Sequence, residues 1–186
     1  MAPDPTDPPV LESDRVRLRP LRTGDAADVF ALYSNPEVCR YWSFAPWTTL
    51  AQAEAWLAER MPMRPPSVYG WALTEPGEDR FIGTTALFSL SGPNQRAELG
   101  YSLRPARQGR GLAREAVRLA LDHAFGPLGL QRVEADVDPR NEPSWRLLEH
   151  FGFQREGRLR NRWRVGGEFA DSWMYGLLKA DYRRAA

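Results

Sequence analysis

The chain has 186 residues, of which 42% are hydrophobic and 26% charged, and its formal net charge is +1. This length suits one domain with its own core, and the near-neutral charge argues against a protein that coats nucleic acid or anionic lipid. One cysteine, Cys39, and two histidines exclude an intrachain disulfide and a cysteine- or histidine-rich metal centre, so we expect no metal and a cytoplasmic location.

The N-terminal stretch MAPDPTDPPVLES is rich in proline and acidic residues. It lacks the basic start and apolar run of a signal peptide. We expect residues 1–12 to form a flexible tail and residues 13–182 to form the single domain. No run of the sequence is long and apolar enough to cross a membrane.

Three elements are predicted in the first third of the chain. The alternating RVRLRPL, residues 15–21, predicts a strand. A short helix capped by Thr23 or Asp25 follows, and Asn35-Pro36 ends it. The segment TTLAQAEAWLAERM, residues 48–61, predicts a second helix with one mainly apolar face.

The rest of the chain predicts a meander, a crossover and a closing hairpin. YGWALTE and RFIGTTALFSL, separated by the turn PGED, form a hairpin, and RAELGYSLRP adds a third strand. A helix to about Phe125 and the strand QRVEADVD complete a right-handed crossover. A helix over residues 141–151 and a hairpin around Gly166-Gly167 follow. The order β-α-α-β-β-β-α-β-α-β-β gives an α+β fold around a single mixed sheet.

The stretch RPARQGRGLAREA, residues 104–116, opens the central helix without a capping residue. A helix start exposes four backbone N–H groups that Ser, Thr, Asp or Asn normally caps. Instead, arginines crowd the positive end of the helix dipole, namely Arg104, Arg107, Arg110 and Arg114. A bound anion would accept hydrogen bonds from the uncapped N–H groups and pair with the arginines. Gly109 and Gly111, which lack a Cβ atom, would let the anion reach the backbone. We therefore predict an anion site, the alternative being a glycine loop with solvated arginines.

The motif QGRGLA, residues 108–113, fits the [QR]-x-x-G-x-[GA] signature of the GCN5-related N-acetyltransferases (GNATs). From about Arg15 to Leu178 the chain resembles that family. The blocks AELGYSLRPARQGRGLAREA, NEPSWRLLEHFGFQREGRLR and GGEFADSWMYGLL look like those of its RimJ/RimL branch, the ribosomal-protein N-terminal acetyltransferases. The resemblance implies a mostly antiparallel, strongly twisted sheet flanked by helices, and a possible homodimer.

The resemblance also implies an activity and its cosubstrate. The enzyme would transfer an acetyl group from acetyl-CoA to a primary amine, on a protein N-terminus or a small molecule, by direct attack in a ternary complex. The loop would hold the pyrophosphate and the preceding strand the pantetheine arm. The implied coenzyme-binding residues are Tyr101, Ser102, Leu103, Arg104, Arg107, Gln108, Gly109, Arg110, Gly111, Leu112, Ala113, Arg114, Asn141 and Ser144.

Two residues are candidates for catalysis. Glu98 would remove a proton from the amine, because the family often keeps a carboxylate on this strand; the alternative is a structural ion pair with an arginine such as Arg96. Ser144 resembles the serine that lies near the coenzyme sulfur, and its hydroxyl would stabilise the departing thiolate by a hydrogen bond. Many relatives place a tyrosine later on this helix for that task, but Leu148 stands here.

The residues that would bind the acceptor amine are harder to predict from the sequence. Trp42 and Trp47 could grip an apolar or cationic group, and Asp171 could attract an amine or pair with an arginine. Four arginines alternate along one strand and would share one face, namely Arg158, Arg160, Arg162 and Arg164. This face would be solvated unless it binds an acidic substrate, an acidic partner or RNA. His123 is expected on the polar side of its helix.

Alternatives remain open for the function. A non-catalytic acyl-CoA-binding sensor explains the anion site equally well. A longer acyl donor such as succinyl-CoA could replace acetyl-CoA. RNA binding is disfavoured by the net charge.

Overall fold

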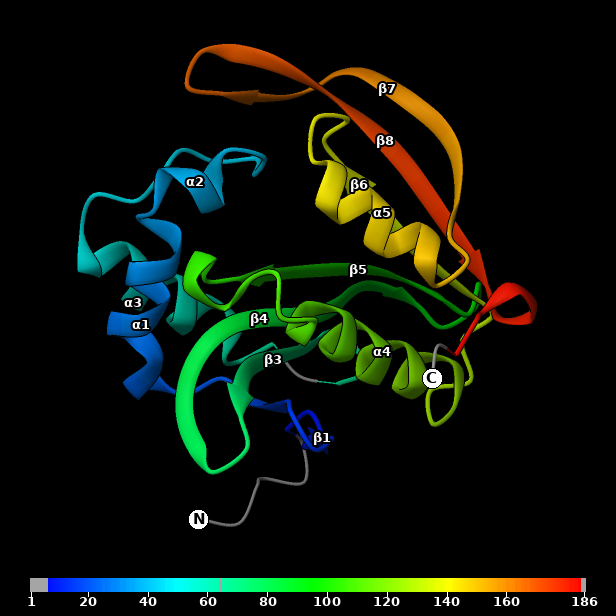
Figure 1. Cartoon of the computed structure of the whole chain (residues 1–186), viewed down its shortest axis with the longest axis horizontal. Coiled ribbons are helices and arrows are strands. Elements are labelled where there is room, and N and C mark those ends of the chain that lie inside the picture. Colours follow the sequence, from blue (N-terminus) through cyan, green and yellow to red (C-terminus); the bar gives the residue numbers. More distant parts are fainter. Residues whose placement is uncertain (1–6, 64, 185–186) are drawn as a thin grey trace.

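Eight strands form one mixed sheet in the order β1-β2-β3-β4-β5-β6-β8-β7 (Figure 1). The computed structural model describes residues 7–63 and 65–184. The strands are β1 (Leu11–Glu12), β2 (Arg17–Pro20), β3 (Tyr69–Glu75), β4 (Glu78–Ser91), β5 (Arg96–Leu103), β6 (Arg132–Val137), β7 (Gln154–Val165) and β8 (Glu168–Leu178). The helices are α1 (Ala26–Tyr33), α2 (Pro36–Cys39), α3 (Leu50–Arg60), α4 (Leu112–Phe125) and α5 (Glu142–His150), with short 3-10 helices at Thr23–Asp25, Pro105–Arg107 and Lys179–Asp181.

The α+β class and the single, mostly antiparallel sheet flanked by helices are confirmed. Among the strands described, only β5 and β6 pair in parallel, as the predicted crossover requires. The other neighbouring strands are antiparallel. Figure 1 shows the strong twist of the sheet, since β7 and β8 run steeply across the direction of β3, β4 and β5.

One short strand lies inside the segment that the sequence assigned to the tail. Leu11 of β1 pairs with Leu18 of β2, and the indole Nε1 of Trp71 donates to the Pro9 carbonyl at 2.8 Å. Residues 7–12 therefore include a segment held against the sheet, while residues 1–6 lie outside the described part of the chain. The domain boundary at residue 13 stays a prediction.

Helix α2 was missed because the residues that end α1 also begin a new helix. The side-chain oxygen of Asn35 accepts from the Glu37 backbone N–H at 2.9 Å, which makes Asn35 an N-cap. Pro36 then occupies the first helical position, where its fixed φ is favourable. The sequence Asn35-Pro36 was interpreted only as a stop signal.

The strands separate two hydrophobic cores. Trp71 and Leu73 of β3 contribute to a core that includes Val117 of α4 and Leu148 of α5. Ala72, between them, points to the opposite face and packs with residues of α1, α2 and α3. This alternation is the two-residue period of a strand. In Figure 1, α4 crosses in front of β3, β4 and β5.

His123 of α4 is buried, so its expected place on the polar side of the helix was wrong. Only 8% of it is exposed, and its ring packs edge-on against Tyr69 and Trp71 with centroid distances of 5.3 and 5.9 Å. Its Nε2 atom has no hydrogen-bond partner among the described residues. Burial lowers the pKa of His123, which favours the neutral imidazole.

Stability is expected to fall as the pH drops below about 6.5, the ordinary histidine pKa. Because the pKa of His123 is lowered in the folded protein, the unfolded chain binds the extra proton first, and stability is lost on acidification. The contribution is at most about 1.4 kcal/mol per pH unit. Urea unfolding at several pH values should show a smaller pH slope for His123→Leu than for the wild type. His150→Gln, at an exposed histidine, should keep the wild-type slope; equal slopes in all three proteins would contradict the assignment.

Candidate active site

The loop before α4 leaves an uncapped helix start. Gly109 and Gly111 adopt φ angles of +72° and +78°, a region that favours glycine. Gly111 is the N-cap of α4, and no side chain caps this helix. Within the described part of the chain, the backbone N–H groups of residues 109–114 donate no hydrogen bond. Free N–H groups at a helix N-terminus form a ready site for an anion.

The arginines on this loop are less free than the sequence suggested. Arg104 donates to the Asp28 carboxylate at 2.6 Å. Arg107 and Arg110 lie 3.0 and 3.7 Å from Glu75. These carboxylates come from α1 and β3, far away in sequence, so the pattern around the loop could not indicate them. The ion pairs hold the loop in place and reduce the crowding of like charge.

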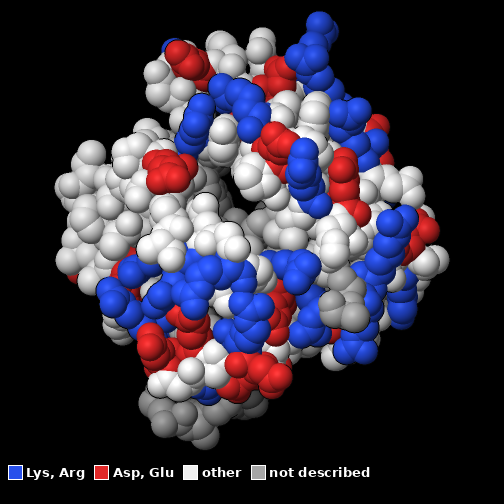
Figure 2. Space-filling view, viewed as in Figure 1, with Lys and Arg blue, Asp and Glu red and all other residues white. Residues whose placement is uncertain are grey.

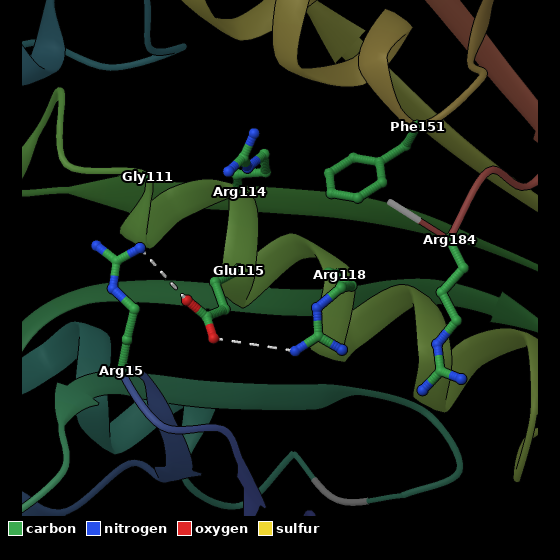
Figure 3. Close-up of a pocket in the computed structure, with 7 residues that line it drawn as sticks. All are labelled: Arg15, Gly111, Arg114, Glu115, Arg118, Phe151 and Arg184. Atoms are coloured by element: carbon green, nitrogen blue, oxygen red, sulfur yellow. Dashed lines mark ion pairs between the residues drawn. The ribbon is translucent and has the colours of Figure 1, made fainter. Parts of the chain in front are cut away.

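A cavity of about 410 Å³ opens beside the first turns of α4 (Figure 3). It is lined by Arg15, Gly111, Arg114, Glu115, Arg118, Phe151 and Arg184. Glu115 lies between Arg15 and Arg118 and approaches both, whereas Arg114 makes no ion pair with a described residue. With four arginines and one glutamate, the cavity extends the basic character of the loop. Arg15, Arg118 and Arg184 were not predicted from the sequence, because only the fold brings them together.

Strands β5 and β6 separate near this loop. They pair only between residues 96–98 and 132–134. Beyond this point β5 stays with β4 as far as Leu103, while β6 stays with β8. Figure 2 shows a hollow near the centre of this face, with basic side chains along its lower rim and a mostly uncharged surface to its left. A ligand could lie between the two halves of the sheet.

The open edge of β5 offers backbone groups to such a ligand. The Arg104 N–H donates to the Ile82 carbonyl of β4, and successive residues of a strand point to opposite edges. The N–H groups of Tyr101 and Leu103 therefore point to the edge that β6 has left. The Leu103 carbonyl on that edge accepts from Gln108 Nε2 at 3.0 Å, which ties the strand to the loop.

Tyr101 and Ser144 meet across this split. The Tyr101 hydroxyl lies 2.9 Å from Ser144 Oγ and 3.2 Å from the Ser144 carbonyl oxygen. Asn141 is the N-cap of α5 and its carbonyl accepts from the Ser144 N–H at 3.1 Å, although its side chain makes no cap bond. Leu148 is fully buried in the core. The contact of the Tyr101 hydroxyl with Ser144 was not predicted from the sequence.

Within the described part of the chain the Glu98 carboxylate has no ion partner, so the structure does not contain the alternative role, an ion pair with an arginine such as Arg96. Arg96 donates instead to Glu134 of β6 at 2.7 Å, and Arg132 donates to the same carboxylate at 2.8 Å. Glu98 is the parallel register partner of Glu134, but its side chain makes no hydrogen bond or ion pair with a described residue. The residue is half-buried, and its carboxylate is available to a ligand.

The two predicted acceptor tryptophans belong to an aromatic cluster. Trp42 and Trp47 pack on Tyr33 with centroid distances of 5.4 and 5.0 Å. Phe44 and Trp56 contact the same ring. All four neighbours of Tyr33 are half-buried, so the cluster supports the packing of α1 to α3 and also presents apolar surface.

Ser102 is directed to this cluster. The Tyr33 hydroxyl lies 3.2 Å from Ser102 Oγ and 3.1 Å from Thr84 Oγ1, and these two oxygens are 2.9 Å apart. Ser102 is 8% exposed. Its side chain therefore joins α1 to the sheet, on the opposite face from Tyr101 and Leu103.

Asp171 is already paired with an arginine. Arg158 Nε donates to its carboxylate at 2.7 Å, and the Asn161 N–H donates at 2.8 Å. These bonds, that of the Asn161 backbone first, lower the pKa of Asp171. Of the two roles that the sequence left open for Asp171, the structure contains the ion pair.

The four arginines of β7 do not share one face, contrary to the prediction. The pairing with β8 is shifted between Leu159 and Trp163, and Asn161 has a φ of +52°. As a result the consecutive residues Arg162 and Trp163 both approach Asp136, at 3.6 and 3.3 Å. A bulge of this kind breaks the alternation of a strand.

The comparisons with known proteins fit this geometry. Residues 15–154 match the family model described as an acetyltransferase (GNAT) domain. An uncharacterized N-acetyltransferase, p20, from Bacillus licheniformis is 35% identical over 92% of this chain and 97% of its own length. The spermidine N(1)-acetyltransferase of Escherichia coli K12 is 28% identical over 90% of this chain and 88% of its own. The crystal structure of the spermidine N-acetyltransferase of Vibrio cholerae in complex with CoA and spermine has the same fold, with a TM-score of 0.80, 24% identity and coverage of 91% of this chain and 99% of that chain. The chain therefore belongs to the GNAT family and is an acyl-CoA-dependent N-acetyltransferase.

Proposed function

We propose that the protein transfers an acetyl group from acetyl-CoA to a small-molecule amine. The observation that carries the proposal is the uncapped start of α4, where the N–H groups of residues 109–114 have no acceptor among the described residues. A pyrophosphate would accept from these groups, and Arg114 would neutralise part of its charge. The basic cavity with Arg15, Arg118 and Arg184 suits the further phosphate of the coenzyme.

The pantetheine arm would follow the open edge of β5. An amide-containing chain can bond to the Tyr101 and Leu103 N–H groups much as a strand would. Its sulfur would then lie near Ser144, with Asn141 at the start of the same helix. In this arrangement Arg104, Arg107 and Gln108 shape the loop, because each is bonded to another part of the protein.

The reaction we propose is direct attack of the amine on the thioester. Glu98 removes one proton from the ammonium group, directly or through water, so that the neutral amine can attack. The nitrogen loses its second proton to water once it has bonded to the carbonyl carbon. The nitrogen bonds to the carbonyl carbon, an N–H group of the β5 edge stabilises the oxygen that becomes negative, and the carbon–sulfur bond breaks with its electron pair on sulfur. The protein contributes no nucleophile and acts mainly by positioning the reactants.

A small-molecule acceptor is supported by relatives that are named spermidine acetyltransferases. The acceptor would contact the exposed parts of Trp42 and Trp47, which offer apolar and cation–π contacts. Asp171 is not needed for this contact, since Arg158 and Asn161 already satisfy its carboxylate.

A protein N-terminus, the acceptor of the RimJ/RimL branch, is the second candidate. Strand β7 is an exposed edge of the sheet, and its Arg160 and Arg164 make no ion pair with a described residue. An extended acidic peptide could bind along this edge. No described helix is both long and apolar enough to span a membrane. The cytoplasmic location and the homodimer stay predictions.

An acceptor screen tests the proposal. The protein is mixed with acetyl-CoA or succinyl-CoA and with spermidine, simple monoamines or peptides with a free acidic N-terminus, and thiol release and product mass are measured. We expect acetyl-CoA with a small amine to give the fastest thiol release and an acetylated product. Fastest turnover of the peptides would favour the second candidate. Binding of acetyl-CoA without amine-dependent thiol release across a broad panel would instead favour the sensor.

A further inference from the structure

The Ser144 hydroxyl has a hydrogen-bond partner, Tyr101, that comes from strand β5 and not from its own helix α5. Leu148, about one turn further along α5, is fully buried and has no hydroxyl group. The phenol of Tyr101 instead reaches across from β5 and places its oxygen 2.9 Å from Ser144 Oγ. A phenol therefore lies beside the candidate catalytic serine, although it comes from a different element of the fold.

We infer that Tyr101 orients the Ser144 hydroxyl so that its proton points at the coenzyme sulfur. This inference rests on the proposed function, because it assumes that the thioester binds in the split between β5 and β6. Tyr101 is a positioning residue in this scheme, and Ser144 is the residue that touches the sulfur.

The hydrogen bonds of the pair can be counted. A phenol has one proton, and a serine hydroxyl has one proton and two lone pairs. When the Tyr101 hydroxyl donates to Ser144 Oγ, the serine proton is free to donate to sulfur. The Ser144 carbonyl, 3.2 Å from the same phenol, is the alternative acceptor that keeps Tyr101 at this position before the coenzyme binds.

No proton has to cross this pair during the reaction. The carbon–sulfur bond breaks and its electrons stay on sulfur, which leaves as a thiolate that accepts a hydrogen bond from Ser144. The first proton of the ammonium group goes to Glu98 or water, and the second leaves the nitrogen to water after the nitrogen has bonded to the carbonyl carbon. The thiolate takes a proton from solvent afterwards. Burial raises the pKa of Tyr101 to about 12, so the phenol keeps its proton at neutral pH and remains a donor.

The bound product gives a readout that does not depend on the acceptor. CoA is titrated with base on the protein, and the ultraviolet absorbance of the thiolate reports the pKa of the bound thiol. We expect Ser144→Ala to raise that pKa by about one unit and Tyr101→Phe to raise it by a similar or smaller amount. Because Tyr101 acts through Ser144, the double variant should match Ser144→Ala alone.

A matched control separates this role from packing. Tyr175 is buried and donates to Glu149 of the same helix at 3.0 Å, so Tyr175→Phe should leave the thiol pKa unchanged. A wild-type pKa in Tyr101→Phe, or additive shifts in the double variant, would overturn the inference while the proposed function stands. If the wild-type protein does not bind CoA, the proposed function fails first, and the role of Tyr101 fails with it.

Discussion

Replacing Gly111 with aspartate is expected to weaken CoA binding at least about 100-fold, whereas asparagine at the same position should weaken it about tenfold or less. Gly111 has a φ of +78°, and Asn and Asp are the side chains that tolerate this region best. The two variants therefore share the backbone strain and differ in one negative charge. That charge would lie among the N–H groups that we assign to the pyrophosphate.

Calorimetric titration with CoA measures the difference directly. Folding should change by no more than about 1 kcal/mol, because a carboxylate at a helix N-terminus is favourable to the helix dipole. A Cβ atom at Gly111 would come no closer than 3.6 Å to Arg15 Nη1, so the site has room for the side chain. Similar affinities for the aspartate and asparagine variants would remove this loop as the phosphate site.

The architecture was predictable because its signals are local. The alternation in β3 and β4, the turn between them and the Gly-containing start of α4 each lie within a few residues. The two shortest elements, β1 and α2, were missed because their own residues carry too little local signal. Strand β1 has two residues and is recognisable only through its pairing with β2, and α2 begins at a proline that also reads as a stop.

The candidate site was predictable only where one segment supplies it. Gly109, Gly111 and the uncapped N–H groups are a property of the loop itself. The ion partners are not, since Asp28 and Glu75 approach the loop from other elements. Similarly, the Tyr101 hydroxyl meets Ser144 across 43 residues of sequence.

Strand patterns also fail where register is irregular. The four arginines of β7 alternate in sequence, but the shift around Asn161 turns Arg162 and Trp163 toward the same carboxylate. A bulge has no clear signature in this stretch, because Asn161 is an ordinary polar residue between two arginines. The shared contact of Arg162 and Trp163 with Asp136 is therefore visible only in the folded structure.

Replacing Glu98 with glutamine is expected to lower turnover by a factor of about 10² to 10⁴, with CoA affinity unchanged. An amine attacks only when neutral, and without a base the enzyme depends on the small fraction of amine that is already deprotonated. That fraction rises with pH. The defect should therefore be largest at low pH and shrink as the pH approaches the pKa of the free amine.

Glu134→Gln is the matched control. Glu134 is the register neighbour of Glu98, but its carboxylate is held by Arg96 and Arg132. Its replacement should reduce thermal stability more than turnover, and the pH profile should keep the wild-type shape. A Glu98→Gln profile parallel to the wild type at every pH would mean that the proton leaves by another route, with water on the open edge of β5 as the remaining base. The arrangement of charges favours Glu98, since it is the carboxylate of this neighbouring pair that pairs with none of the described arginines.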